Sequence, residues 1–321
     1  MRKVVIVGYP DADLLDISGP WEVLHSANQL SEEPAYEIVL ATPDGRPIRC
    51  DSGLTLGSAL RLDHVCGPLD TIIVAGGPGH DRAASDTRVL EQLRALATVS
   101  KRVASVCSGA TLLAAAGLLD GKRATTHWAY AATFAQRFPR VTVDPAPLFV
   151  RDGTVYTAGG VTSGLDLTLA LVEEDHGPSL ARAVARALVT YLQRPGNQAQ
   201  VSMFLSAPPP RHRVVADLAA HITGNPGTDL STPALAATAG LSVRQLTRLF
   251  DEHLGSTPGR YVRSVRTEAA AQLLATTELP LTAIARRCGF GSNEALRQAF
   301  LDHYDLPPSA YRRIHQRHSL R

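Results

Sequence analysis

The sequence predicts two domains of different fold class: an N-terminal α/β domain with a doubly wound, mostly parallel sheet, and an all-α C-terminal domain. Residues 1–190 alternate short aliphatic segments with helical stretches, the pattern of a parallel sheet covered by helices. The last third of the chain instead repeats one helical pattern at an offset of 50 residues. A chain of 321 residues is long enough to bury a separate core in each domain.

The elements of the first domain follow from the positions of its aliphatic runs. Strands are expected at 4–8, 36–41, 71–75 and 102–106, with a hairpin across Asp152 and Gly153. Helices are expected at 20–30, 89–97, 109–116, 128–138, 165–174 and 178–192. The first aliphatic run ends at Gly8, too early for the apolar region of a signal peptide, so we interpret it as a strand.

Composition narrows the class of protein. A hydrophobic fraction of 45% and a mean hydropathy of −0.02 are typical of a globular chain. No run approaches the roughly 20 apolar residues of a membrane span, so no membrane partner is expected. The four cysteines show no CxxC spacing, which favours a reducing cytoplasm. We expect neither a metal site nor a cofactor.

The net charge of +2 conceals an asymmetry between the two parts of the chain. Residues 1–190 hold 17 Lys and Arg against 21 Asp and Glu, whereas residues 191–321 hold 15 against 9. All 15 cations of the C-terminal part are arginine. A basic face is often merely solvated, but this balance indicates that only the C-terminal part meets a polyanion.

The repeat at an offset of 50 residues is the sharpest signal in the sequence. Six positions recur in the same order, as Ser242 and Ser292, Leu246 and Leu296, Phe250 and Phe300, His253 and His303, Pro258 and Pro308, and Tyr261 and Tyr311. A helix from Pro258 to about 275 is expected between the copies. Its eighteen or so residues span roughly 27 Å, near the ~34 Å repeat of the DNA duplex, so two helices fit successive major grooves.

Each copy has the pattern of a helix-turn-helix. In the first, Thr232 is expected to cap a short helix that ends at Gly240, and Ser242 to cap a second helix. The second copy repeats this plan, with a break at Gly289 and Ser292 as the cap. The second helix of each copy has a buried stripe and a polar, Arg-bearing outer face. A plain helical bundle would explain one copy, but two copies on a rigid spacer favour DNA binding.

The runs LSVRQLTRLF at 241–250 and IAxxCGFGS at 284–292, with PSAYR at 308–312, resemble the signature of the AraC/XylS family over about residues 213–315. The resemblance implies transcriptional control through paired half-sites on double-stranded promoter DNA, often as a homodimer, with RNA polymerase as a further candidate partner. By position it assigns these DNA-binding side chains: Ser242, Arg244, Gln245, Arg248, Ser292, Asn293, Arg297 and Gln298.

Three motifs of the first domain lie where its predicted strands end, which is where doubly wound sheets bind ligands. VASVCSGA at 103–110 has the geometry of a nucleophile elbow with Cys107 at its apex. Amides of the following helix would favour a thiolate or a bound anion there. AGGPGH at 75–80 is a glycine-rich loop that can approach a ligand closely. DLLDISGPWE at 13–22 places Asp16 just before a helix that Pro20 is expected to start.

These motifs, with GKRATTHW at 121–128, resemble the ThiJ/PfpI superfamily, which is glutamine amidotransferase-like, over about residues 1–190. Joined to the C-terminal repeat, they resemble the GlxA-type branch of the AraC regulators. The resemblance implies a flavodoxin-like fold in which Asp16 lies near the Cys107 thiol, with His127 close by. Protease-like members carry histidine directly after the cysteine, where this chain has Ser108, so proteolysis is not expected. Isonitrile hydratase-like members pair that cysteine with an acid, so hydration chemistry stays an alternative.

We therefore expect a transcription regulator, not an enzyme, whose first domain binds a small polar effector, amino-acid-like or nitrogenous. The loop TAGGVTSG at 157–164 ends another strand and adds a wall to the pocket. The expected ligand-binding residues are Asp16, Gly77, Pro78, Gly79, Cys107, Ser108, His127, Val161 and Thr162.

Ordinary roles compete with each of these assignments. Cys107, Asp16 and His127 are the candidates should the domain retain hydratase- or amidase-type catalysis. Cys107 could instead be an inert buried thiol, Asp16 could cap the helix at Pro20 or pair with an arginine, and His127 could be a satisfied core residue. The loop at 76–79 could be a plain turn. The other cysteines, Cys50, Cys66 and Cys288, are expected to be structural.

The domains are expected at 1–192 and 213–321. The linker at 193–212 contains three consecutive prolines at 208–210, typical of a stiff spacer. The first domain is expected to dimerise, since tethering two DNA-binding domains raises affinity. A constitutive regulator whose first domain only dimerises is a third interpretation. The effector, the target promoters and the sign of regulation stay open.

Overall fold

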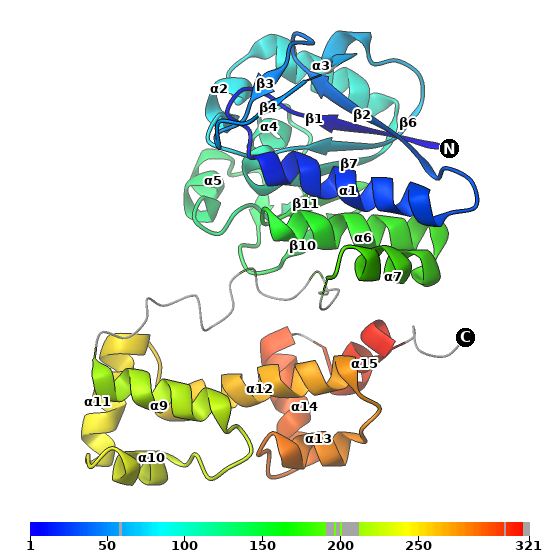
Figure 1. Ribbon diagram of the computed structural model, residues 1–321. Coiled ribbons are helices and arrows are strands. Elements are labelled where there is room, and N and C mark those ends of the chain that lie inside the picture. The colour runs from blue at the N-terminus through cyan, green and yellow to red at the C-terminus, as the bar shows by residue number, and fades with distance from the viewer. Residues whose placement is uncertain (58–59, 191–195, 197–199, 201–211, 305, 317–321) are drawn as a thin grey trace. The chain divides into compact units, whose positions relative to one another are not determined.

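The computed structural model describes residues 1–57, 60–190, 196, 200, 212–304 and 306–316 (Figure 1). The chain divides into two compact units, Met1–Gln200 and Val201–Arg321, and the division falls within the predicted linker. Most of that linker, including its prolines, lies outside the described residues.

A seven-stranded sheet in the order β10-β11-β7-β6-β1-β2-β5 forms the centre of the first unit. Its strands are β1 (Arg2–Val7), β2 (Tyr36–Thr42), β5 (Leu60–Arg61), β6 (Leu69–Val74), β7 (Ser100–Val106), β10 (Phe149–Asp152) and β11 (Val155–Ala158). All neighbours are parallel except the β10–β11 hairpin. The predicted doubly wound, mostly parallel sheet is confirmed. Every residue of β6 is buried, as expected for a strand covered on both faces.

Helices cover both faces of this sheet (Figure 1). On one face α1 (Leu14–Leu30), α6 (Thr162–His176) and α7 (Pro178–Ala187) pack against one another. On the other, α2 (His80–Ala84) and α3 (Thr87–Thr98) pack with α4 (Ala110–Ala115), and α5 (Ala131–Arg137) follows. The short pairs β3 (Ile48–Arg49) with β4 (Thr55–Leu56), and β8 (Arg123–Ala124) with β9 (Thr142–Val143), were not predicted, because two residues show no periodicity.

The predicted start of the first helix was wrong. Helix α1 begins six residues before Pro20, at Leu14, because the Asp13 carboxylate caps it by accepting a hydrogen bond from the Leu15 amide at 2.9 Å. Pro20 therefore lies inside the helix, where it removes the hydrogen bond to the Asp16 carbonyl. Asp16, expected just before the helix, stands in its first turn.

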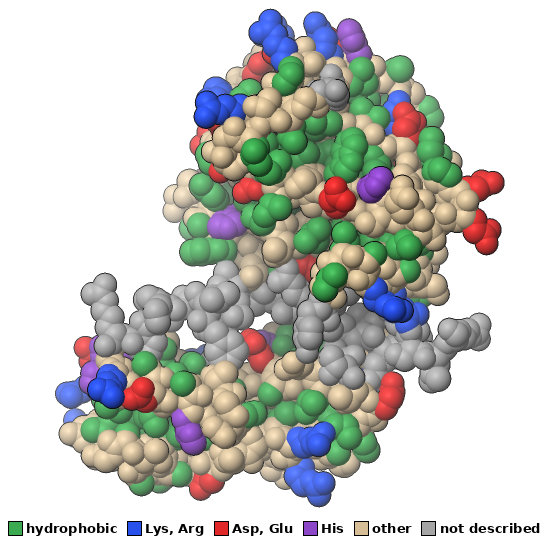
Figure 2. All heavy atoms as spheres, in the orientation of Figure 1, with side chains coloured by type: hydrophobic (Ala, Val, Ile, Leu, Met, Phe, Trp, Pro, Cys, Tyr) green, Lys and Arg blue, Asp and Glu red, His purple; other side chains and the backbone are tan. Residues whose placement is uncertain are grey.

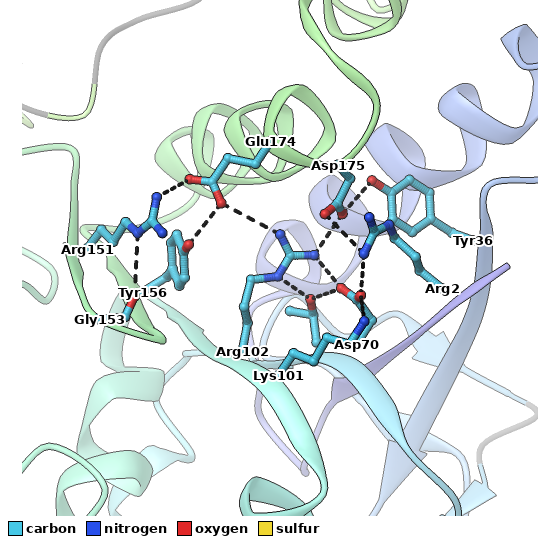
Figure 3. A network of polar contacts seen from close by, with 11 residues as sticks. Arg2, Tyr36, Asp70, Lys101, Arg102, Arg151, Gly153, Tyr156, Glu174 and Asp175 are labelled. Atoms are coloured by element: carbon cyan, nitrogen blue, oxygen red, sulfur yellow. Dashed lines mark hydrogen bonds and ion pairs between the residues drawn. The ribbon is translucent and has the colours of Figure 1, made fainter.

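A network of buried charges lies at the amino ends of the parallel strands (Figure 3). Arg102 is a residue of β7. Its guanidinium donates to Asp70 on β6 and, at 2.7 Å, to Asp175 at the end of α6. Arg2 donates to Asp70 at 2.7 Å, and the Tyr36 hydroxyl donates to Asp175 at 2.9 Å. The side chains of Asp70 and Asp175 are only 4% and 5% exposed. This network fastens α6 to three strands at the end of the sheet opposite the candidate site.

The second unit is all-helical, and the predicted double helix-turn-helix is confirmed. Its helices are α9 (Arg213–Gly224), α10 (Thr232–Thr238), α11 (Val243–Leu254), α12 (Pro258–Thr276), α13 (Leu281–Arg287), α14 (Asn293–Tyr304) and α15 (Pro308–Gln316). One expected cap was wrong: Ser231, one residue before Thr232, caps α10 by accepting from the Ala234 amide. Ser231 lies upstream of the proline that occupies the first turn, the usual order for a cap.

Two separate hydrophobic cores hold this unit together. The first surrounds Leu246 and Phe250 of α11, and the second surrounds Leu296 and Phe300 of α14. The helix between the two copies, α12, joins both, since Val265 packs in the first core and Leu274 in the second. Each helix-turn-helix is therefore a small packing unit of its own, and α12 is the rigid piece they share (Figure 1).

Candidate functional site

Four loops meet at the carboxyl ends of the strands β1, β6, β7 and β11, where the sequence predicted a pocket. At their centre Cys107 directly follows β7 with φ 56°, the strained left-handed conformation of a nucleophile elbow. Gly76 lies so close that a Cβ there would stand 2.6 Å from Cys107 Cβ and 2.7 Å from an Asp16 oxygen. Only glycine fits between these two side chains.

Asp16 connects two of the loops through its carboxylate. Its Oδ2 accepts from the Gly76 amide and its Oδ1 from the Val161 amide, both at 3.0 Å, and the residue is fully buried. Neither ordinary role considered for Asp16 is found, because Asp13 caps α1 and both Asp16 oxygens bind backbone amides. The predicted proximity of Asp16 to Cys107 is seen through their shared contact with Gly76.

The electrostatics of the centre favour neutral forms. Burial, reinforced by the charge of Asp13, raises the pKa of Asp16 to about 7, although hydrogen bonds from Val161 and Gly76 oppose the shift. Burial and the neighbouring Asp16 raise the pKa of Cys107 to about 12. The expected stabilisation of a thiolate by helix amides is therefore outweighed, and the Cys107 side chain is a thiol at neutral pH.

His127 and Ser108 complete the centre from two sides. A Cβ on Gly160 would stand 3.0 Å from His127 Cδ2 and 3.2 Å from the Cys107 sulfur, so the His127 and Cys107 side chains both lie against Gly160. Burial lowers the pKa of His127, and its Nδ1 accepts from the Ala129 amide. The Ser108 hydroxyl accepts from the Gly77 amide at 2.9 Å, which fixes the glycine-rich loop to the elbow.

Three predicted pocket residues lie differently from the rest. Pro78 and Thr162 are exposed, and Gly79 lines another cavity of about 440 Å³ together with Tyr9 and Arg82. That cavity holds charged side chains that are already paired, such as Arg82 with Asp11 at 2.7 Å. Because Cys107, Asp16 and His127 do not line it, we place the candidate site at the Cys107 centre and not in the 440 Å³ cavity.

Sequence reasoning missed one polar group beside this centre. The side chain of Gln200, in the predicted linker, binds the segment that carries His127: its Oε1 accepts from the Trp128 amide at 3.0 Å. No periodicity or motif marks residue 200, and the two residues are 72 positions apart in sequence. A contact of this kind has no local signal.

Replacing Asp16 with asparagine should remove a pH dependence of stability. An acid whose pKa rises from 3.8 to about 7 on folding stabilises the folded state fully below pH 3.8, and this contribution is lost as pH rises through 7. Relative to Asp16→Asn, wild type should lose about 1.4 kcal/mol of unfolding free energy per pH unit in this window. Urea unfolding at pH 5, 6, 7 and 8 measures the slope, and parallel curves for the two proteins would contradict it.

In the second unit, the second helix of each copy presents its polar face to solvent. Ser242 caps α11 in a reciprocal capping box: its hydroxyl accepts from the Gln245 amide at 3.3 Å, and its backbone amide donates to the Gln245 side chain at 3.0 Å. Ser292 accepts from the Ala295 amide at 3.1 Å in the second copy. All eight predicted DNA-binding side chains are exposed: Ser242, Arg244, Gln245, Arg248, Ser292, Asn293, Arg297 and Gln298.

The two exposed faces differ in how their polar groups are engaged. Among the described residues, Arg244 and Arg248 on α11 have no carboxylate partner. On α14, Arg297 instead pairs with Glu294 at 2.8 Å, and Gln298 donates to Asp302 at 2.7 Å. The face of this unit seen in Figure 2 shows its Arg side chains towards its two ends, over the two copies.

Two exposed, Ser-capped helices lie on a shared rigid helix and follow an α/β unit with a cysteine elbow. This combination defines a class: helix-turn-helix transcription regulators with an N-terminal α/β domain. Comparison with known proteins agrees. Residues 2–174 match the model of the DJ-1/PfpI family, and residues 235–314 match a helix-turn-helix domain.

Full-length relatives carry both parts. The chain is 32% identical over 304 residues to the HTH-type transcriptional regulator GlxA of Rhizobium meliloti, covering 94% of this chain and 92% of the relative. It is 30% identical over 298 residues to the HTH-type transcriptional regulator GbdR of Pseudomonas aeruginosa, covering 92% and 80%. The chain belongs to the AraC family of transcriptional regulators, in the group whose helix-turn-helix region follows a DJ-1/PfpI domain.

Other similar proteins match a smaller part of the chain. The chain is 37% identical over 177 residues to isonitrile hydratase of Pseudomonas putida, covering 55% of this chain and 73% of the relative. A crystal structure of a ThiJ/PfpI family protein from Pseudomonas syringae matches with a TM-score of 0.56 at 26% identity, over 75% of this chain and 91% of that one. Drosophila melanogaster DJ-1beta, at 20% identity and a TM-score of 0.52, shares the fold over 59% of this chain and 97% of its own.

The described residues contain no cluster of three or more His, Cys, Asp or Glu side chains arranged to hold a metal ion. They also contain no helix that combines the length and the apolar character required to cross a membrane.

Proposed function

We propose that this transcriptional regulator binds paired promoter half-sites in response to a small polar metabolite held at the Cys107 centre. The observation that carries the proposal is the pair of exposed helices, α11 and α14, on one continuous helix: this spacing suits successive major grooves on one side of the duplex. Arg244, Gln245 and Arg248 read one groove, and Asn293, Arg297 and Gln298 read the next.

Sequencing of genomic fragments bound by the purified protein tests this proposal directly. At physiological salt, we expect enrichment of promoter fragments that share two half-sites about one helical turn apart. The genes beside those promoters would then identify the pathway of the effector. Binding that shows no shared sequence and disappears with salt would contradict sequence-specific recognition.

Arg248→Ala should weaken binding to such a site and relax its base preference. A guanidinium that contacts a base edge contributes about 1–3 kcal/mol of discrimination, so we expect a loss of roughly 10- to 100-fold in affinity for the specific site. Arg213→Ala on α9 is the matched control, since it removes one exposed arginine that pairs with Asp217. Fluorescence anisotropy with the enriched site and a scrambled duplex measures both, and equal losses for the two variants would contradict a base contact.

The effector in this proposal is amino-acid-like or nitrogenous, and the first unit also dimerises. Support for a polar ligand comes from the buried, hydrogen-bonded side chains of Asp16 and Ser108 and the half-buried ring of His127 around one cysteine. Dimerisation rests on the gain from tethering two DNA-binding units. Light scattering at micromolar concentration, with and without DNA, tests it, and a monomer in both conditions would refute it.

Catalysis at Cys107 is a second candidate function. The observation in its favour is the strained elbow at φ 56° next to a carboxyl whose pKa of about 7 lets it exchange a proton at neutral pH. The high pKa of the thiol argues against a nucleophile in the free protein. A Cys107→Ala variant that keeps full DNA binding and effector response would argue for a binding role, whereas turnover of an isonitrile by wild type alone would favour chemistry.

A further inference from the structure

The Gln200 carboxamide sits in a cradle built for a nitrogen. Its Nε2 lies within hydrogen-bond distance of four oxygens: Thr125 Oγ1 at 2.9 Å, Thr126 O at 2.8 Å, Pro145 O at 3.2 Å and Pro147 O at 3.2 Å. Its Oε1 accepts from the Trp128 amide at 3.0 Å, and its backbone amide donates to Ala146 O at 2.8 Å. We call Thr125, Thr126, Trp128, Pro145 and Pro147 the amide cradle.

The amide cradle shares its walls with the Cys107 centre. The Thr126 hydroxyl donates to the Cys107 carbonyl at 3.0 Å, and the Thr125 amide donates to the Thr157 hydroxyl at 2.8 Å. A Cβ on Gly159 would collide with the Gln200 carboxamide, and the next residue, Gly160, faces the cysteine. The Cys107 centre and the amide cradle are therefore neighbouring sites, with Thr126 and the Gly159–Gly160 backbone between them.

The donor and acceptor count of the cradle does not match the group that occupies it. A carboxamide nitrogen carries two N–H groups, but four oxygens surround it. A primary ammonium carries three N–H groups and a positive charge, so it satisfies this set of oxygens more fully. A carboxylate has only acceptors and would be repelled.

We propose that the amide cradle is the subsite for the primary amine or amide nitrogen of the effector, and that Gln200 is an internal occupant which the effector displaces. The inference rests on the proposed function and assigns its ligand class. Gln200 is the last residue of the first unit, so displacing its carboxamide removes the side-chain hydrogen bonds that hold the end of this unit and leaves the backbone bond to Ala146. Effector binding and the side-chain attachment of Gln200 are then mutually exclusive.

An NMR titration of the full-length chain tests the subsite with small probes. Backbone amide signals of Thr125, Thr126 and Trp128 are followed while propylammonium, propionamide or propionate is added. In Gln200→Ala we expect the first two probes to shift these signals with millimolar dissociation constants, as suits ligands of few atoms, and propionate to have no effect. In wild type, where Gln200 must first leave, the apparent affinity should be about ten-fold lower if Gln200 occupies the cradle nine-tenths of the time.

Two further variants keep the test decisive. Gln200→Glu places a carboxylate against the cradle oxygens and should bind the nitrogen probes as Gln200→Ala does, so misfolding of one variant does not end the experiment. Gln29→Ala, an exposed glutamine on α1, should behave as wild type. The proposal is overturned if no nitrogen probe shifts these signals, if propionate shifts them equally, or if wild type and Gln200→Ala bind the probes with the same affinity.

Failure here is separable from failure of the proposed function, because the titration uses no DNA. A chain that selects promoter half-sites but shows no probe binding in the cradle would overturn only this inference. A chain whose cradle binds propylammonium but which selects no half-site would leave the subsite in place and refute sequence-specific regulation.

Discussion

Replacing Arg102 with alanine is expected to destabilise the first unit by about 3–5 kcal/mol, because it leaves two buried carboxylates without their main partner. Arg102 donates to both Asp70 and Asp175, whose side chains are almost inaccessible to water. Burial alone would raise the pKa of Asp70, but the hydrogen bond from Arg2 and the charge of Arg102 lower it. The network therefore favours the ionised form of Asp70 in a place where burial disfavours it.

Urea unfolding of the first unit, followed by circular dichroism, measures this effect. Arg102→Lys should recover part of the loss, since it restores the charge but not the planar fork that reaches both carboxylates. The matched control is Arg151→Ala: Arg151 also pairs with a carboxylate of this network, Glu174, but it is largely exposed, so we expect a loss below about 1 kcal/mol. Similar small losses for Arg102→Ala and Arg151→Ala would show that the buried carboxylates are not held by Arg102.

Acid should weaken the same network in wild type. The pKa of Asp70 is lower in the folded protein than its ordinary value of 3.8, so its contribution to stability is present above that pH. The contribution is lost as pH falls through the folded pKa. Asp70 and Asp16 therefore act with opposite sign, one stabilising the fold towards neutral pH and the other towards acid.

Phe300→Ala is expected to unfold the second helix-turn-helix and to reduce affinity for paired half-sites by at least about 100-fold. Phe300 is fully buried and packs against Tyr304 and Tyr311, with ring centroids 5.1 and 5.5 Å apart. Truncating a buried phenylalanine costs about 3–5 kcal/mol, a large part of the stability of a core this small. The loss of one recognition helix removes its base and phosphate contacts together.

The equivalent substitution in the first copy, Phe250→Ala, should have the complementary effect. Phe250 packs against Tyr261 in the other core, so each variant should lose contacts to one half-site and keep the other. Footprinting on the enriched promoter distinguishes the two, and the salt dependence of binding should become less steep in both. Val243→Ala, a truncation of an exposed apolar side chain, is the control. Loss of both half-sites in either variant would show that the two cores unfold as one.

The parts of the fold that local chemistry determines could be predicted from the sequence. Capping serines located the starts of α11 and α14, because a cap depends on neighbours three residues away. The aliphatic runs located the long strands of the sheet. The start of α1 was misplaced because Pro20 was taken as a first-turn residue, while packing against α6 holds it in the interior of the helix.

In the candidate site, too, the features that local sequence determines could be predicted and those that depend on distant residues could not. Motifs brought Cys107, Asp16 and Ser108 to one place, since each follows or precedes a strand of recognisable sequence. Their ionisation could not be predicted, because it depends on burial that only the assembled loops create. Gln200 was assigned to a linker for the related reason that its partners lie more than fifty residues away in sequence.

The continuous helix α12 makes the distance between half-sites a discrete quantity. Because both cores are built on it, adding one residue would advance the second reading helix by about 1.5 Å and rotate it by about 100° around the axis. Only insertions near whole turns would restore its phase, and seven residues, two turns, correspond to roughly three base pairs of duplex. The spacing between the half-sites of an operator for such a protein therefore cannot change by single base pairs. A change in that spacing requires a matching change in the length of α12, by a number of residues close to whole helical turns.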